Sequence, residues 1–384
     1  MRNDLTKLKV YVIDPLNCED ADDAFSIEII DEKINLWIFI ADPTNEFNIN
    51  DLIYKKIIDQ GITKYSLFEK PINLFPKEII EKCSLNKGIK NAIGVLLILD
   101  KSLEIIENKI DLVKIKIEKH LVYEETEIDE NIELAIKISE KFYNDRKGNG
   151  KILNDYQLAL PKLINNKWKL ILDNPKTIKI KKIISEFAIK TNQIIAEKLN
   201  INLNRICNFN YNCNYNNPFQ IIHKIINDGI NAKYQLSNEH HQLIDNKIYT
   251  HFTSPLRRAN DCLVHFLLKG YNIKLDEIEK ITERINIINK EDKKRQYEEI
   301  KKASLMALNE MEKPIEIKLR LLNSRGIFIN FILYKINELD SQISITIRRN
   351  NFNINEKEYK LKVYKINLNG KYDEEIIPIL KTIE

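Results

Sequence analysis

Four aspartates fall within ten residues near the start of this 384-residue chain, between two patterns that predict strands. The segment from Asp14 to Asp23 follows the apolar run from Val10 to Ile13, and an apolar alternation resumes over Ala24 to Ile30. The acidic segment is therefore expected to connect two strands, with one end held by a rigid strand. Carboxylates about 4 Å apart repel by roughly 4 kcal/mol at an effective dielectric of 20, so their convergence favours a bound divalent cation.

All-oxygen ligands select a hard ion, Mg²⁺ with Mn²⁺ as the alternative, over zinc. The candidate ligands are Asp14, Asp20, Asp22 and Asp23. For this segment taken alone, a solvated acidic turn is the alternative interpretation.

A second segment, from Tyr249 to Asp261, predicts a helix start that holds a phosphate. Ser254 suits the cap and Pro255 the first helical position, which leaves free backbone N–H groups and the positive end of the helix dipole facing a ligand. Arg257 in the first turn can grip a phosphate with two parallel hydrogen bonds, and Asp261, four residues later, can orient it. The alternative is that Arg257 and Asp261 form an ordinary exposed helical ion pair.

Together, these two segments resemble the two signatures of the RNB family of exoribonucleases. The matching residues are Ile13 to Pro15, Asp20 to Ala24, and His251 to Arg258. Between the signatures, three further runs look most like the bacterial exoribonuclease II branch: Ile40 to Thr44, Leu74 to Glu78, and Cys83 to Leu85. The resemblance extends from about Arg2 to about Met311, and it is weak between roughly residues 130 and 180.

The resemblance implies a Mg²⁺-dependent 3′-to-5′ exoribonuclease that hydrolyses single-stranded RNA processively to nucleoside 5′-monophosphates. It assigns metal binding to Asp14, Asp20 and Asp23, the second metal or attacking water to Asp22, and the scissile phosphate to Arg257. A two-metal site of this kind stabilises the attacking and leaving oxygens of an in-line displacement. The implied catalytic residues are Asp22, Asp23 and Arg257, and the implied metal ligands are Asp14, Asp20, Asp22 and Asp23.

RNA contacts are also implied by the resemblance. Tyr65 falls where the family places an aromatic side chain that stacks on the 3′-terminal base, and such stacking tolerates any base. A core tyrosine is the alternative role for Tyr65. The implied RNA-binding residues are Tyr65, His251, Thr253, Ser254, Arg257 and Arg258.

Several positions depart from the family pattern. Ala259 stands where a tyrosine usually follows the two arginines, and Phe266 replaces the arginine that usually follows His265. Lys294 lies in the helical stretch where the family generally carries a supportive glutamate, and the nearby Glu291 is out of register. These changes bear on rate and RNA grip more than on reaction type, and because all four aspartates and the key arginine are present, an active enzyme is favoured.

Two other functions are consistent with the same sequence. One is a catalytically inactive RNB-type RNA-binding protein that acts in RNA control, motivated by Lys294, Ala259 and Phe266. The other is a metal-binding structural domain without RNA, motivated only by the acidic segment. An active enzyme needs metal and consumes RNA, an inactive relative binds RNA without consuming it, and a structural domain ignores RNA.

The predicted fold class is α+β, with two domains. Residues 1–312 are expected to form an RNB-type ribonuclease catalytic domain of mixed sheet and helices, because strand-like stretches precede residue 120 and helical spacing follows. Helices are expected over Asn131 to Phe142, Ile183 to Leu199 and Asp276 to Met311. On the second of these helices, Glu186 and Asn192 match polar positions near the family's RNA channel, with an ordinary helix-surface role as the alternative.

After Pro314 the apolar period changes from helical to two, with a turn at Ser324 to Gly326. The repeating pattern supplies enough strands for a small five-stranded barrel. Residues 313–384 therefore resemble a reduced form of the family's C-terminal OB-type RNA-binding domain. A structural β-domain without RNA affinity is the alternative.

The net charge is only +4, so any RNA path must be a local concentration of basic residues. Five scattered cysteines suggest neither a zinc site nor a disulfide framework: Cys18, Cys83, Cys207, Cys213 and Cys262. The start of the chain lacks a signal peptide's apolar core, so a reduced cytoplasmic compartment is expected.

Relatives usually carry two cold-shock-type domains ahead of the catalytic domain, whereas here the first signature begins almost at the N-terminus. The clamp that receives single-stranded RNA is therefore expected to be missing, with RNA binding that is weaker and more sensitive to salt. The chain is expected to be a monomer, with a partner protein as the alternative source of that clamp.

Overall fold

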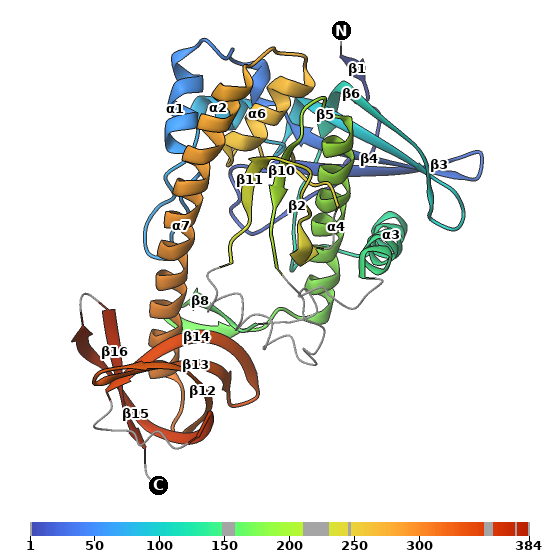
Figure 1. Cartoon of the computed structure of the whole chain (residues 1–384). Helices are drawn as coiled ribbons and strands as arrows, with labels where there is room; N and C mark the ends of the chain where they lie inside the picture. Colours follow the sequence, from blue (N-terminus) through green and yellow to red (C-terminus); the bar gives the residue numbers. More distant parts are fainter. Residues whose placement is uncertain are drawn as a thin grey trace.

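The computed structural model describes residues 2–147, 158–209, 230–244, 247–348, 356–372 and 375–382. Its N-terminal body is built on a five-stranded sheet with the strand order β1-β6-β5-β4-β3 (Figure 1). The short first strand pairs parallel with β6, and the other neighbours are antiparallel. The strands are β1 (Asn3–Asp4), β3 (Asp23–Ile30), β4 (Lys33–Ala41), β5 (Gly88–Leu99) and β6 (Ile105–Ile117).

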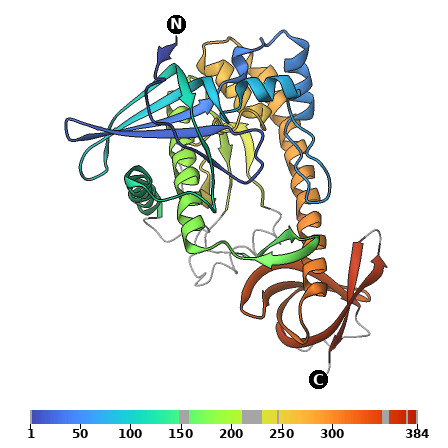
Figure 2. The same cartoon turned by 180° about the vertical axis from the view of Figure 1, so that it is seen from behind.

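Helices and short ladders surround this sheet. Figures 1 and 2 show α1, α2 and α6 gathered at one end of the long helix α7, while α4 runs beside the β10–β11 ladder. The helical segments are η1 (Pro43–Asn45), α1 (Leu52–Gln60), α2 (Lys77–Cys83), α3 (Glu130–Lys147), α4 (Pro175–Lys198), η3 (Gln242–Ile244), α6 (Ala259–Leu268) and α7 (Leu275–Glu310). The two-stranded ladders are β2 (Val12–Asp14) with β7 (His120–Val122), β8 (Leu160–Ile164) with β9 (Lys167–Ile171), and β10 (Leu203–Ile206) with β11 (Lys233–Leu236).

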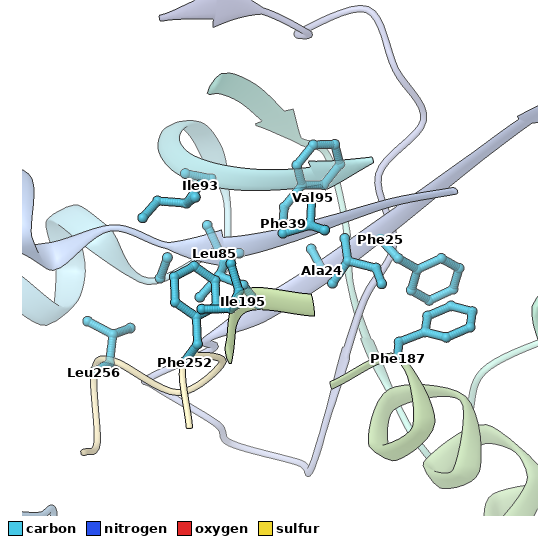
Figure 3. Packing of buried hydrophobic residues seen from close by; sticks show 14 of the residues in the cluster. Ala24, Phe25, Phe39, Leu85, Ile93, Val95, Phe187, Ile195, Phe252 and Leu256 are labelled. Carbon is cyan, nitrogen blue, oxygen red and sulfur yellow. The ribbon is translucent and has the colours of Figure 1, made fainter. Parts of the chain in front are cut away.

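An aromatic contact fastens α4 to the sheet. Phe25 of β3 meets Phe187 of α4 edge-on with ring centroids 5.4 Å apart (Figure 3). The Phe25 ring also stacks on Tyr11, with centroids 5.3 Å apart. Aromatic pairs contribute about 0.5–1.5 kcal/mol beyond their burial. Because β3 begins at Asp23, this packing fixes the strand from which the last of the four aspartates projects.

Gly61 ends α1 in a conformation that disfavours a side chain. Its φ is +75°, and the Ile62 N–H donates across it to the Gln60 carbonyl at 2.9 Å, which is a strained γ-turn. A Cβ would lie 2.9 Å from the Ile288 Cδ1 atom. Gly61→Ala is therefore expected to lower the free energy of unfolding by about 1–2 kcal/mol, as measured by urea denaturation. Lys56→Ala on the exposed face of α1 is the control, and equal stability of both variants would contradict the prediction.

The C-terminal part is an antiparallel five-stranded sheet of OB type, with the strand order β14-β13-β12-β15-β16. It lies at the far end of α7, whose 36 residues span about 54 Å (Figure 1). One hydrophobic cluster of the body ends at Ile285, and a separate cluster begins at Leu305 and fills the barrel. We propose that the domain boundary lies at the expected junction of residues 312 and 313, just after α7, whose last turns contribute Leu305 and Leu308 to the C-terminal cluster. The strands are β12 (Ile315–Arg325), β13 (Phe328–Ile336), β14 (Leu339–Arg348), β15 (Glu358–Tyr372) and β16 (Glu375–Thr382).

The predicted fold class is confirmed, and the three expected helices correspond to α3, α4 and α7, with α4 and α7 each ending one residue earlier than expected. The predicted helix start at Ser254 is wrong, because α6 begins only at Ala259. The Asp261 carboxylate accepts from the Ser254 N–H at 2.8 Å and from the Arg258 side chain, and this pairing folds the preceding residues into a turn. Helices α1 and α2 and the β8–β9 ladder were not predicted, since their short patterns resemble strands and loops.

None of the helices in the described ranges is both long and apolar enough to cross a membrane. The four cysteines within those ranges are free thiols, and Cys213 lies outside the described residues.

Candidate active site

The four aspartates lie on the β2–β3 connection and face one cavity. Asp14 is the last residue of β2, and Asp23 is the first residue of β3. The Asp22 carbonyl accepts from the Ala41 N–H at 2.8 Å, so the connection is also held by β4. All four aspartates line a cavity of about 820 Å³ together with Tyr65, Tyr123 and Arg257.

Asp22 joins the two sequence signatures, which are 235 residues apart at this contact. One oxygen of its carboxylate accepts from the Leu256 N–H at 2.8 Å, and the other accepts from the Arg257 Nε at 3.0 Å. The Arg257 Nη2 donates to the Ser254 Oγ at 2.8 Å. The arginine is therefore fixed at two points, and its side chain remains 44% exposed towards the cavity.

Burial and like charges raise the pKa values of two of the aspartates. Asp22 is only 3% exposed, and burial raises its pKa to about 7 although the charge of Arg257 opposes the shift. The pKa of Asp23 is raised well above its usual range by burial and then by the charges of Asp14 and Asp22. Negative charge is thus concentrated without enough compensation, which is the electrostatic condition that a cation relieves.

The donor set fits a hard divalent cation by its chemistry, because four carboxylates share one cavity. Within the described residues, however, no three acidic, histidine or cysteine side chains are grouped as a finished metal site. Asp22 is instead engaged by Arg257 and the Leu256 N–H. The assignment of individual ligands therefore stays a proposal.

Tyr65 lies at the edge of the cavity, on the loop between α1 and α2. Its side chain is 38% exposed, which excludes the core role, and its hydroxyl donates to the Asp20 carboxylate. Burial and the charge of Asp20 raise the pKa of Tyr65, so it is a neutral donor. The base of the loop is tied to the second signature, because the Thr63 N–H donates to the Arg257 carbonyl at 3.0 Å.

The residues before Arg257 are held inside the protein. The His251 Nδ1 lies 2.7 Å from the Tyr234 hydroxyl, and burial, followed by the charge of Arg258, lowers the His251 pKa. Thr253 and Ser254 are buried. These residues shape the turn that presents Arg257.

Two polar residues of α4 are buried, so their alternative role on the helix surface is wrong. The Asn192 side chain accepts from the Phe252 N–H at 2.8 Å and donates to the Tyr249 hydroxyl at 3.0 Å. The Glu186 carboxylate pairs with the Arg146 Nη2 at 2.6 Å. Helix α4 therefore supports the second signature through Asn192.

The expected pairing of Arg257 with Asp261 is wrong. Asp261 instead accepts from the Arg258 Nε at 3.0 Å and Nη2 at 2.7 Å, while Arg257 turns to Asp22. The difference follows from the late helix start, since residues 257 and 261 are not one helical turn apart here.

Two departures from the family pattern belong to the core. Ala259 and Phe266 are fully buried, and the Phe266 ring packs edge-on against Phe47, Tyr54 and Tyr271. Neither residue lines the cavity described above.

The third departure lies on α7, where Lys294 is exposed. The acidic side chain of this helix that reaches the Tyr65 loop is Glu299, whose Oε2 accepts from the Leu67 N–H at 2.8 Å. Glu291, which is out of register with the family pattern, is exposed.

Sequence reasoning missed two further residues near the aspartates, of which Tyr123 lines the cavity and His120 contacts Asp14. The His120 Nε2 lies 3.2 Å from the Asp14 Oδ2, and Tyr123 lines the cavity with a pKa raised by burial and then by Asp23. Both follow from the parallel pairing of β2 with β7, which places Val122 beside Asp14. The only sequence signal was the short apolar run after His120.

The geometry and the sequence agree with one class of protein. The RNB domain family model matches residues 2–210 and 206–274, and the chain belongs to this family. Members are typically 3′-to-5′ exoribonucleases and generally use Mg²⁺. No curated protein matches the chain.

Solved structures of the same fold come from bacteria and yeasts. RNase R from Mycoplasma genitalium, in complex with ribose-methylated single-stranded RNA, matches with a TM-score of 0.77 at 18% identity, covering 100% of this chain and 72% of that one. An active-site mutant of the Dss1 exoribonuclease from Candida glabrata matches with a TM-score of 0.79 at 16% identity, covering 100% and 55%. Yeast Ssd1, a pseudonuclease, matches with a TM-score of 0.71 at 17% identity, covering 94% and 51%. These similarities establish the fold, and they include both nucleases and a pseudonuclease.

Proposed function

We propose that this protein is a Mg²⁺-dependent 3′-to-5′ exoribonuclease, which hydrolyses single-stranded RNA processively and releases nucleoside 5′-monophosphates. The observation that carries the proposal is the cavity where the four aspartates meet Arg257. A cavity that combines four carboxylates with a guanidinium suits a phosphodiester, whose charge must be balanced at both the attacking and the leaving oxygen.

The four aspartates and Arg257 have distinct roles in the proposed reaction, and His120 supports one of the aspartates. Mg²⁺ held by Asp14, Asp20, Asp22 and Asp23 would supply the charge that activates water and stabilises the leaving oxygen. Arg257, fixed by Asp22 and Ser254, holds the scissile phosphate through charge-assisted hydrogen bonds. His120 orients the Asp14 carboxylate through its Nε2.

RNA binding is proposed to depend on stacking by Tyr65 and on the residues that hold the turn carrying Arg257. The exposed ring of Tyr65 stacks on the 3′-terminal base, and its bond to Asp20 sets the ring's orientation over the carboxylates. His251, Thr253, Ser254 and Arg258 act by holding the turn that carries Arg257, since their side chains are engaged or buried within the protein. The C-terminal sheet is proposed to bind RNA upstream of the cavity, in a chain that acts as a monomer in the cytoplasm.

A catalytically inactive RNA-binding protein is the second candidate. The similarity to the yeast pseudonuclease favours it, since an inactive protein can keep the same fold. Ala259 and Phe266 do not favour it, because both are core residues. Family membership leaves the structural metal-binding domain without support.

A time course on a 5′-labelled single-stranded RNA tests the proposal. With Mg²⁺, the purified protein is expected to produce a descending ladder that ends in a short fragment, because cleavage starts at the 3′ end. EDTA is expected to abolish the ladder, since the carboxylates alone cannot neutralise the developing charge. Intact RNA that shifts on a native gel would support the inactive RNA-binding protein, and RNA that is neither cut nor bound would contradict both.

A further inference from the structure

One face of α7 grips the loop that carries Tyr65. The loop is closed at its base by a bridge between Lys64 and Ile72. The loop is contacted by Arg295, Glu299 and Lys302, which are four and three residues apart and so share one face of the helix. The contacts follow the same order along the helix and along the loop, from the backbone of Tyr65 to the ring of Phe68.

The first two contacts are charge-assisted hydrogen bonds to the loop's backbone. The Arg295 Nη2 donates to the Tyr65 carbonyl at 2.6 Å, and the Glu299 Oε2 accepts from the Leu67 N–H at 2.8 Å. Arg295 also donates through Nη1 to the Glu299 Oε1 at 2.5 Å and through Nη2 to the buried Asp292 at 2.7 Å. Bonds to Asp292 and Glu299 thus hold the guanidinium on α7 in the orientation in which it contacts the loop.

The third contact is made by a ring. The Lys302 Nζ lies 4.8 Å from the centroid of the Phe68 ring, and the Trp168 ring of β9 lies 5.3 Å away at 54°. Trp168 itself packs in a small cluster with Ala303 and Ala307 of α7. Phe68 therefore contacts groups that belong to α7 or rest on it, while 39% of the residue remains exposed, and these contacts anchor the far side of the loop.

We propose that Arg295 is a positioning residue for Tyr65: through the Tyr65 carbonyl and the Glu299 bridge, it holds the aromatic ring where it meets both the Asp20 carboxylate and the 3′-terminal base. The stacking step rests on the proposed function, whereas the grip on the loop does not. Without these contacts, the loop stays attached at its base through the Thr63 N–H and the Arg257 carbonyl. The residues from Tyr65 to Phe68 then lose their hold on α7.

Hydrogen exchange of the free protein tests the grip without RNA. In Arg295→Ala, amides of residues 62–74 are expected to exchange about tenfold faster than in the wild type, because a charge-assisted hydrogen bond is lost and the local opening becomes easier. Lys294→Ala, the exposed neighbour on the same helix, is the matched control and is expected to leave exchange unchanged. Phe68→Ala removes only the ring anchor, so it tests the same loop if Arg295→Ala disturbs α7. Unchanged exchange in both loop variants overturns the proposal.

A fluorescent RNA end tests the positioning. In an Asp22→Asn background that stops cleavage, an RNA with 2-aminopurine at its 3′ end is expected to be quenched on binding, because the base stacks on Tyr65. Arg295→Ala is expected to lose most of this quenching, as Tyr65→Ala does, while Arg295→Lys restores part of it and Lys294→Ala retains it. Faster exchange with full quenching overturns the positioning role. Binding without quenching in the parent protein refutes the stacking role of Tyr65 instead, and the exchange result still decides the grip.

Discussion

Asp22→Asn is expected to reduce the rate of RNA hydrolysis by about 10³-fold, because it removes the charge that both fixes Arg257 and faces the phosphate. The substitution keeps the shape of the side chain and its acceptor for the Leu256 N–H. The loss should therefore appear in kcat more than in RNA affinity. Single-turnover rates on labelled RNA measure it, and a variant that keeps more than about a tenth of the activity contradicts the assignment.

The matched control is Asp31→Asn in the exposed turn between β3 and β4. Asp31 has a φ of +48°, which asparagine tolerates well, so fold and activity should both be retained. Equal losses in the two variants would show that the effect of Asp22→Asn is not specific to the cavity.

The same substitution should change how stability depends on pH in the metal-free protein. Because the folded pKa of Asp22 is raised to about 7, the folded state binds more protons than the unfolded state between about pH 4 and pH 7. The contribution of Asp22 to stability therefore falls as the pH rises through this window, and the loss persists above it. In Asp22→Asn, the decrease in stability between about pH 4 and pH 7 is expected to be smaller. Because Arg257 is half-exposed, losing its ion pair with Asp22 should lower the free energy of unfolding only a little.

Urea denaturation in EDTA from pH 4 to pH 8 measures this difference. Added Mg²⁺ is expected to stabilise the wild type at pH 8, because a ligand that binds only the folded state raises its stability. The gain should be smaller in Asp22→Asn. The same dependence of stability on pH in the wild type and in Asp22→Asn would contradict the raised pKa of Asp22.

Local patterns predicted the strands around the acidic segment and the barrel's alternation, because these depend on residues close in sequence. The resemblance of the two segments to the family's two signatures likewise predicted that Asp22 and Arg257 belong to one site. The partner of Arg257 was not predictable, since helical spacing favoured Asp261 and only the fold shows that Asp261 is already taken by Arg258 and the Ser254 N–H. The contacts of Asp22 with Leu256 and Arg257, 234 and 235 residues away, then hold the turn in place.

The supports of the cavity were invisible in the sequence for the same reason. His120 reaches Asp14 through a parallel pairing of two three-residue strands, and Arg295 reaches Tyr65 across 230 residues. No periodic pattern marks either contact. Basic and aromatic residues in such places look like ordinary surface or core residues until the elements are placed in space.

Asp42→Asn is expected to cause the largest loss of stability, about 3–5 kcal/mol at pH 7, because it leaves buried cations without their carboxylate. The Asp42 side chain is fully buried where β4 meets α6. It accepts from the Lys269 Nζ at 2.7 Å, from the Thr44 hydroxyl at 2.9 Å and from the Arg2 guanidinium. Burial raises the pKa of Asp42, but the hydrogen bonds and charges of His265 and Lys269 lower it by more. The net pKa therefore lies well below the usual range.

The sign of the pH effect follows from that depressed pKa. The stabilising contribution of Asp42 is fully present above the unfolded pKa near 4 and is lost as the pH falls towards the folded value. The stability difference between the wild type and Asp42→Asn should thus be constant from about pH 5 upwards and shrink below about pH 4. Guanidinium denaturation at pH 7 and pH 3 measures it, with Glu133→Gln in an exposed helical ion pair as the control, expected to cost at most about 0.5 kcal/mol. If Asp42→Asn costs no more than this control, the network does not hold α6 to the sheet; if a further Lys269→Met change restores stability, the cost came from the unpaired cation.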